Sequence, residues 1–259
     1  MPEALSRSQR RIVADVMSAV ASDGFVIAGG VALIAAGISS RPTHDLDAFS
    51  ATCDDVARVA GHLIEQLRGS GYLVEVHRSD SAFARMTVST GKYRRTVLVV
   101  ELGRDHQLFA SVGSTLGPML SIRELAANKV LAAFGRREPR DLVDLASLAD
   151  ATSLRQAVVD GRTKDPGFSR DPFVEMVSRT MLVRDDLWPD GSDPEGLREV
   201  IPERLELGFL IRDLLVRDGG DHHLRGRSRR PAPATGFFFA IAADQESSQA
   251  AADQADNVS

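Results

Sequence analysis

The sequence has little that would cross-link the chain or anchor it in a membrane. Cys53 is its only cysteine, so no disulfide can form within the chain, and a reducing compartment is expected. The N-terminal segment is polar and charged, which predicts that no secretory signal peptide is present. No apolar run approaches the roughly 20 residues of a membrane span. We therefore expect a soluble, cytoplasmic protein that makes no membrane contact.

Aromatic residues are also scarce, at 5%, so the core must be built mainly from Ala, Val, Leu and Ile. The 259 residues, 43% of them hydrophobic, suffice for a sizeable core and for one or two domains. A net charge of −5 argues against nonspecific coating of nucleic acid, although a local basic patch could still bind RNA or DNA. Ser-x-x-Lys and nucleophile-elbow patterns are absent, and no internal repeat is found.

Hydrophobic periodicity predicts an α/β (α+β) first half and a mostly helical second half. In the first half, helices are expected over 4–22, 31–36 and 53–70, and strands over 25–28, 45–49, 72–77, 82–89 and 96–102. In the second half, helices are expected over 121–134, 140–148, 154–160, 171–180 and 194–217. This order predicts a small mixed sheet with helices packed on it, followed by a helical domain.

Turn and cap residues set the expected boundaries of these elements. Gly37 is expected to end the second helix, and Thr52 or Asp54 to cap the third. Gly91-Lys92 is expected to form a hairpin turn. Ser121 and Glu124 form a capping-box pattern. We expect a catalytic domain over 1–118, a helical domain over 119–218, and a disordered tail over 219–259, which is first basic and Pro-rich and then polar.

The most informative stretch runs from Gly29-Gly30 to Asp45-Leu-Asp47. A glycine pair between a strand and a helix can bring backbone N–H groups close to an anion, because no Cβ is in the way. Asp45 and Asp47 lie at i and i+2 of an expected strand, so both carboxylates point to one face. Mg²⁺ relieves repulsion between such carboxylates and is usually held together with substrate phosphates. The stretch predicts a metal-and-nucleotide site; the alternative is a tight turn beside a solvated acidic strand end.

This stretch resembles the first motif of the polymerase-β-like nucleotidyltransferase superfamily, in which a Gly-Gly turn receives the triphosphate and Asp-x-Asp holds the metals. The resemblance implies Mg²⁺, or Mn²⁺ in its place, and a nucleoside triphosphate (NTP) as substrate. It also implies a third carboxylate from a neighbouring strand, for which Glu101 and Asp105 are both candidates. Glu101 departs from the family's Asp and lies in an apolar strand, where an acid is costly unless it is paired or metal-bound. A salt bridge to Arg94 or Arg95 is the alternative explanation.

A second group of charged residues lies in the helices expected from 121 to 148. Lys129 is a compact cation suited to a triphosphate. Asp141 and Asp144, at i and i+3, share a helix face, where they can orient a cation or act as a general base. The alternative is a solvated, charge-laced surface helix. Three arginines of the same segment can make bidentate phosphate contacts: Arg136, Arg137 and Arg140.

In order and spacing, this second motif resembles the helical part of the AbiEii/AbiGii-type nucleotidyltransferase toxins, including the MenT-like group, over roughly residues 20–150. The resemblance implies that a nucleoside monophosphate is added to a hydroxyl, with the 3′ end of tRNA as acceptor. It also implies neutralisation by a cognate antitoxin, and a hydroxyl at Thr43 implies silencing by phosphorylation. The alternative role of Thr43 is hydrogen bonding at the strand start. The nucleotide site implied comprises Gly29, Gly30, Arg41, Thr43, Lys129, Arg136 and Arg140.

Two other functions remain open at this stage. An aminoglycoside-type nucleotidyltransferase would share the Gly-Gly and Asp-x-Asp motifs, but the basic run at 136–140 does not suit a drug pocket. A catalytically inactive nucleotide-binding protein is disfavoured by the intact Asp pair and by Lys129. The sequence leaves open which NTP and which RNA are used, how Asp141 and Asp144 divide their roles, and what the oligomeric state is.

Overall fold

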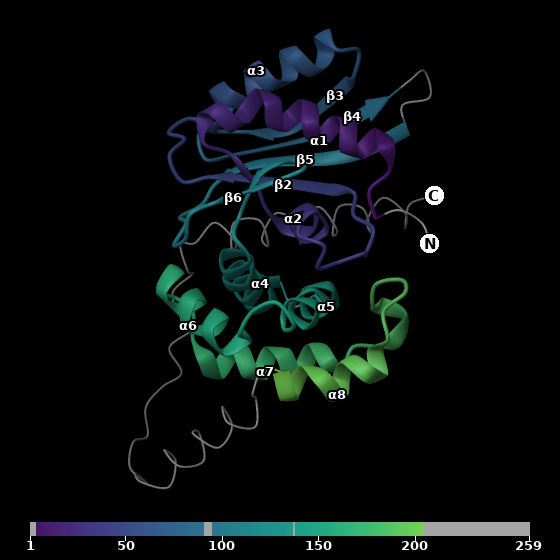
Figure 1. Cartoon of the computed structure of the whole chain (residues 1–259), viewed down its shortest axis with the longest axis vertical. Coiled ribbons are helices and arrows are strands. Elements are labelled where there is room, and N and C mark those ends of the chain that lie inside the picture. Colours follow the sequence, from purple (N-terminus) through teal and green to yellow (C-terminus); the bar gives the residue numbers. More distant parts are fainter. Residues whose placement is uncertain (1–3, 91–94, 137, 205–259) are drawn as a thin grey trace, which may run out of the picture. The chain divides into compact units, whose positions relative to one another are not determined.

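The computed structural model describes residues 4–90, 95–136 and 138–204 and divides the chain into two compact units, Met1–Leu125 and Ala126–Ser259 (Figure 1). The division falls inside helix α4 (Ile122–Arg136). The first unit contains a mixed sheet with helices, and the described part of the second is helical. The predicted mixed α/β fold class is therefore confirmed.

In the described part of the first unit, the sheet has seven strands in the order β3-β4-β5-β2-β1-β7-β6. The meander β3-β4-β5 is antiparallel, whereas β2 pairs in parallel with β5 and antiparallel with β1. The hairpin β6–β7 was not predicted, because strands of three residues, Val-Gly-Ser and Gly-Pro-Met, carry no alternating pattern. The bounds are β1 Val26–Ile27, β2 Asp45–Ser50, β3 Leu73–Ser79, β4 Phe83–Thr90, β5 Arg95–Arg104, β6 Val112–Ser114 and β7 Gly117–Met119.

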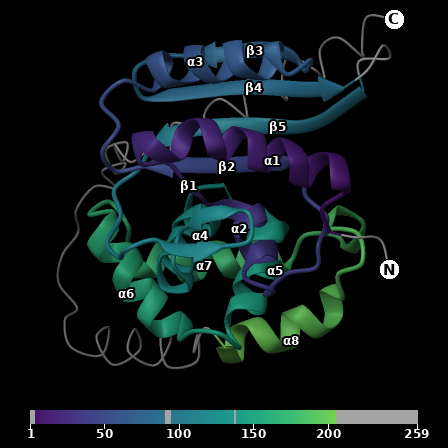
Figure 2. The same cartoon turned by 45° about the horizontal axis from the view of Figure 1, so that its top comes forward.

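Helices α1 (Arg7–Val20) and α3 (Val56–Gly69) pack against each other and against the sheet (Figures 1 and 2). Alternate residues of the central strands β2 and β5 are fully buried: Leu46, Ala48, Leu98, Val100 and Leu102. Because strand side chains alternate between faces, the residues between these buried ones point to the opposite face. Asp45, Asp47 and Glu101 thus share that opposite face.

Two helix ends show which local predictions were right. Helix α2 (Gly29–Ala35) is followed by Gly37 in the left-handed conformation, with φ +71°, as predicted for a C-terminal glycine. Helix α3 is capped by Asp55, whose carboxylate accepts the N–H of Arg58 at 3.2 Å, so the predicted caps were wrong. Thr52 belongs instead to the preceding turn, in which its N–H donates to the Ser50 hydroxyl at 3.3 Å.

The helices after α4 are α5 Pro139–Leu148, α6 Leu154–Lys164, α7 Arg170–Met181 and α8 Pro194–Arg204. Pro139 occupies the first turn of α5, where its missing N–H costs nothing. Helix α6 runs past its predicted end at residue 160. It includes Gly161, where an added Cβ would lie 3.3 Å from Cγ1 of Val130 in α4. The remainder of the helix predicted over 194–217, the Gly91-Lys92 turn and the tail 219–259 lie outside the described residues.

Three of the few aromatic residues gather in the second unit. The Phe168 ring lies 5.0 Å from that of Phe134 and 5.4 Å from that of Phe173, between centroids. Phe168 and Phe173 are buried. These rings thus form an aromatic cluster that contributes to the packing of this unit. Over the ranges given above, no helix combines the length and the apolar character needed to cross a membrane.

Candidate active site

The glycine pair after β1 lies directly against the residues of β2. Gly29 has φ +57°, and a Cβ added there would lie 1.7 Å from Oδ2 of Asp47. A Cβ on Gly30 would lie 3.3 Å from Oγ1 of Thr43. The N–H of Ala28 also donates to the Asp47 carbonyl at 2.8 Å. The structure therefore brings the predicted glycine turn and the predicted acidic pair together, and only glycine fits at position 29.

The register between strands aligns the acids of the sheet. Asp47 pairs with Glu101 across the parallel strands β2 and β5, and Glu101 pairs with Arg85 across the antiparallel strands β5 and β4. The distance from Arg85 Nη1 to Glu101 Oε1 is 3.4 Å. Glu101 is buried and therefore needs such a partner. The sequence had suggested Arg94 or Arg95 as the partner, but Arg95 pairs with Thr90 at the far end of the hairpin, whereas Arg85 lies directly opposite.

Asp105, the other candidate for a third carboxylate, lies elsewhere on the sheet. Its N–H donates to the Ser50 carbonyl at 3.1 Å, at the end of β2 away from Asp45. Asp105 lies four positions beyond Glu101, which corresponds to about 13 Å along an extended chain. Register therefore places Glu101, and not Asp105, beside Asp47.

The donor set on this face suits a hard divalent cation. Three carboxylates, from Asp45, Asp47 and Glu101, lie on one face of two adjacent strands, and oxygen is the ligand atom that Mg²⁺ requires. Within the described ranges, however, no three His, Cys, Asp or Glu side chains are already gathered at metal-ligand spacing. The residues thus fit the ion in chemistry and register, while Glu101 is engaged by Arg85.

Gln9, whose role the sequence did not predict, holds the segment that precedes the acidic pair. Its Nε2 donates to the Thr43 carbonyl at 2.8 Å, and its Oε1 accepts the N–H of Ser6 at 2.8 Å. The Thr43 hydroxyl accepts the N–H of Asp45 at 3.3 Å, the strand-start bond that the sequence allowed. The side chains of Gln9 and Thr43 are both buried. The signal that the sequence offers for the role of Gln9 is a glutamine among the apolar positions of an amphipathic helix. Arg41 lies half-buried in the same connection between α2 and β2.

In the second unit, Lys129 of α4 contacts two aspartates of α5. Its Nζ lies 3.2 Å from Oδ1 of Asp141 and 2.6 Å from Oδ2 of Asp144. Nη2 of Arg136 lies 3.3 Å from Oδ1 of Asp141. Both aspartates are 0% exposed, so the alternative of a solvated surface helix is wrong for this face of α5. The spacing of i and i+3 places both carboxylates on one ammonium group.

The charges of this cluster fix one another's protonation. Burial by itself would lower the pKa of Lys129, but the charges of Asp144 and Asp141 outweigh burial and raise it. Burial would likewise raise the pKa of Asp141, but Lys129, Arg136 and Arg140 hold it below its ordinary value. Arg140 also forms an ion pair with Glu138, the residue that precedes α5. Lys129 is thus kept charged, and Asp141 is a poor proton acceptor. Arg137 lies outside the described residues.

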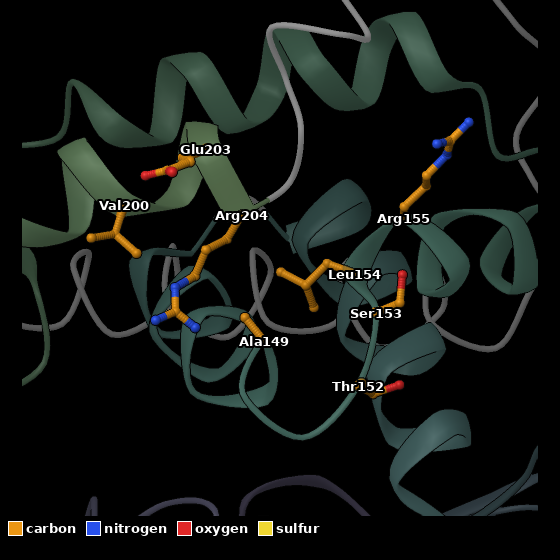
Figure 3. Close-up of a pocket in the computed structure, with 8 residues that line it drawn as sticks. All are labelled: Ala149, Thr152, Ser153, Leu154, Arg155, Val200, Glu203 and Arg204. Carbon is orange, nitrogen blue, oxygen red and sulfur yellow. The ribbon is translucent and has the colours of Figure 1, made fainter.

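A pocket of about 470 Å³ lies in the second unit, between the α5–α6 connection and α8 (Figure 3). Arg155, Glu203 and Arg204 contribute charges of both signs to its lining. Arg204 forms an ion pair with Asp150. None of the predicted site residues lines this pocket, so it is not part of the candidate site.

The chain is similar to one known protein family and to solved structures. A family model described as nucleotidyl transferase AbiEii toxin, type IV toxin–antitoxin system, matches residues 11–188. JHP933 from Helicobacter pylori has a TM-score of 0.54 and 19% identity, covering 83% of this chain and 98% of its own. A second H. pylori protein has a TM-score of 0.52 and 19% identity; the match covers 85% of this chain and 100% of that protein. MenT4, a nucleotidyltransferase toxin from Mycobacterium tuberculosis, has a TM-score of 0.49 and 19% identity; the match covers 76% of this chain and 81% of MenT4. No curated protein matches the chain. The two H. pylori structures share its fold.

Replacing Gly29 tests the contact between the turn and the acidic pair. Gly29→Ala should lower the free energy of unfolding by about 1–3 kcal/mol, because the new Cβ overlaps Asp47 and the positive φ is strained. Gly61→Ala is the control: nothing lies within 4 Å of its added Cβ, so this helical site should gain about 0.5–1 kcal/mol. Urea unfolding measures both. Equal stabilities for Gly29→Ala and the parent would contradict the contact.

Replacing Asp141 tests the buried charge cluster. Its folded pKa is lowered, so the stability it contributes is present above the unfolded pKa of about 3.9 and is lost as pH falls through the folded pKa. Asp141→Asn should therefore cost about 3–5 kcal/mol at pH 7 and progressively less below about pH 4. Asp186→Asn, at a side chain 61% exposed, should cost less than about 0.5 kcal/mol at either pH. Urea unfolding between pH 2.5 and 7 measures both variants. If Asp141→Asn were as stable as the parent at pH 7, or if its loss of stability did not change with pH, the proposed role of the Asp141 charge would be wrong.

Proposed function

Because the chain belongs to the AbiEii family of nucleotidyltransferase toxins, we propose that it transfers a nucleoside monophosphate from an NTP to the 3′ end of tRNA. The family makes it a nucleotidyltransferase of a type IV toxin–antitoxin system, which implies a cognate antitoxin. One observation carries the proposal: the backbone of Gly29 lies against the Asp47 carboxylate, in line with Glu101. A turn suited to phosphate therefore adjoins carboxylates suited to a metal.

Asp45, Asp47 and Glu101 are the residues that would hold Mg²⁺, or Mn²⁺ in its place. When bound, the ion supplies positive charge that stabilises the reacting phosphates and the departing pyrophosphate. Glu101 takes the role of the family's third Asp, and its register beside Asp47 supports this choice over Asp105.

The triphosphate is bound by backbone N–H groups of the glycine turn, which lack a side-chain cap, and by cationic side chains. The resemblance to the family assigns this role to Arg41 of the first unit and to Lys129, Arg136 and Arg140 of the second. Thr43 borders the turn through its contact with Gly30. The acceptor oxygen forms a new bond to the α-phosphorus as the hydroxyl proton passes to water, and the bond from the α-phosphorus to the bridging oxygen breaks, which releases pyrophosphate. Catalysis of this kind depends mainly on positioning and charge.

We assign Asp141 and Asp144 as positioning residues for Lys129. Each carboxylate contacts the Lys129 ammonium, and the lowered pKa of Asp141 makes it a poor general base. A protonated, oriented Lys129 suits phosphate binding. Two fully buried carboxylates contact one lysine, although buried charges are costly. Retention of this costly arrangement favours an active enzyme over an inactive nucleotide pocket. The family favours a toxin over an aminoglycoside-type enzyme.

Transfer can be measured by incubating the purified full chain with Mg²⁺, each α-labelled NTP and total RNA. We expect a labelled tRNA band with at least one nucleotide. Asp45→Ala should abolish it, because one of the proposed metal ligands is lost. Asp54→Ala, an exposed acid just beyond β2, should leave labelling at the parent level. In a parallel reaction an aminoglycoside replaces the RNA. Labelling of the aminoglycoside but not of tRNA, or nucleotide binding without any transfer, would reject the tRNA proposal.

The choice of the third carboxylate predicts a difference between two conservative variants. Glu101→Gln should weaken Mn²⁺ binding about tenfold or more, because even residues that only support metal ligands are worth about that much. Asp105→Asn should bind Mn²⁺ as the parent does, since Asp105 lies beside Ser50. Isothermal titration of Mn²⁺ without nucleotide reads the metal site independently of turnover. If instead Asp105→Asn weakened Mn²⁺ binding and Glu101→Gln did not, the third carboxylate would be Asp105.

A further inference from the structure

The start of helix α1 carries an exposed basic surface, formed by Arg7, Arg10 and the nearby His44. Within the described part of the chain, neither arginine forms an ion pair. Arg10 makes one hydrogen bond, from Nε to the Leu5 carbonyl at 3.3 Å. Arg11 differs, because it interacts with Tyr72, whose hydroxyl lies 2.7 Å from an Asp15 carboxylate oxygen. The basic surface therefore ends before Arg11.

These arginines oppose the electrostatics of their own helix. The first turn of a helix has a positive potential and favours acidic side chains, but α1 has none in its first turn. Arg7 is its first residue, and Arg10 follows on the neighbouring surface three positions later. The chain as a whole has a net charge of −5, so this positive surface runs against the overall balance. Its placement does not serve the stability of the helix.

The basic surface adjoins the strand that carries the acidic pair. Gln9, the neighbour of Arg10, donates to the Thr43 carbonyl at 2.8 Å and lies 3.4 Å from Nδ1 of His44. Asp45 follows immediately as the first residue of β2. Figures 1 and 2 both show the beginning of α1 beside the segment that leads into β2. An anion lying on this surface would thus be next to the entry of the catalytic strand.

We propose that the basic surface binds the phosphate backbone of the acceptor RNA. The inference rests on the proposed function, because it assumes that a polyanionic acceptor must bring its end to the Asp pair. Guanidinium groups without a protein partner can bind backbone phosphates in bidentate geometry. Such contacts fix the register of the RNA without reading its sequence. Arg7 and Arg10 would thereby hold phosphates that precede the reacting 3′ end.

The test is the salt dependence of tRNA binding. Fluorescence anisotropy with a 5′-labelled tRNA transcript, without NTP, is measured for the parent chain and for R7Q/R10Q at several KCl concentrations and fixed Mg²⁺. We expect weaker binding and a logarithmic salt slope that is smaller by about one unit for each arginine removed. R68Q/R104Q is the matched control: it removes the same charge from exposed arginines of the same unit and should keep the parent slope.

A folding defect is separable from a binding defect. Because Arg7 and Arg10 oppose the helix potential, R7Q/R10Q should melt at the parent temperature or slightly above it. Equal slopes for R7Q/R10Q and the parent would overturn the docking surface, while labelling of tRNA by the parent would leave the proposed function standing. If R7Q/R10Q bound tRNA normally but escaped neutralisation by the antitoxin, the surface would belong to a protein partner, and the RNA assignment would be wrong.

Discussion

The candidate catalytic face depends on the contact between the Gly29 backbone and the Asp47 carboxylate. Any side chain at position 29 would occupy the space of that carboxylate, since an added Cβ would lie 1.7 Å from Oδ2. The contact fixes the helix that begins at the turn relative to β2, and the Ala28–Asp47 backbone hydrogen bond supports it. The N–H groups proposed to bind phosphate and the oxygens proposed to bind a metal lie close together because position 29 has no side chain.

Charge balance is the second constraint. Burying an ionised carboxylate is costly unless a cation accompanies it. On the sheet, Glu101 is balanced by Arg85 through direct cross-strand pairing. On α5, Asp141 and Asp144 are balanced by Lys129. Glu101 and the aspartate pair of α5 are thus each paired with a cationic side chain of the protein. Arg7 and Arg10 reverse this pattern: they are cations without an acidic partner in the described chain, as expected for groups that receive an external anion.

Much of the fold could be predicted, and the failures have local causes. Over the described residues, the first five strands and the eight α-helices followed from apolar periodicity, because each element buries one face. The hairpin β6–β7 was missed because its strands are too short to alternate. The predicted cap of α3 was wrong because Thr52, Asp54 and Asp55 all have side chains that can cap a helix. The Thr52 N–H instead donates to the Ser50 hydroxyl, whose position cannot be inferred from the sequence. Arg85 and Gln9 gave no motif, since their roles depend on partners far along the chain.

The sequence by itself determined the chemistry: a glycine turn, Asp45 and Asp47 on one strand face, and Asp141 and Asp144 on one helix face. These follow from repeat periods of two and 3.6 residues, which act over short distances. Only the tertiary structure decided that Glu101 rather than Asp105 lies beside Asp47, that Arg85 is its partner, and that Lys129 contacts both aspartates of α5. Strand register and helix packing are set by burial across the whole unit, so no local pattern encodes them.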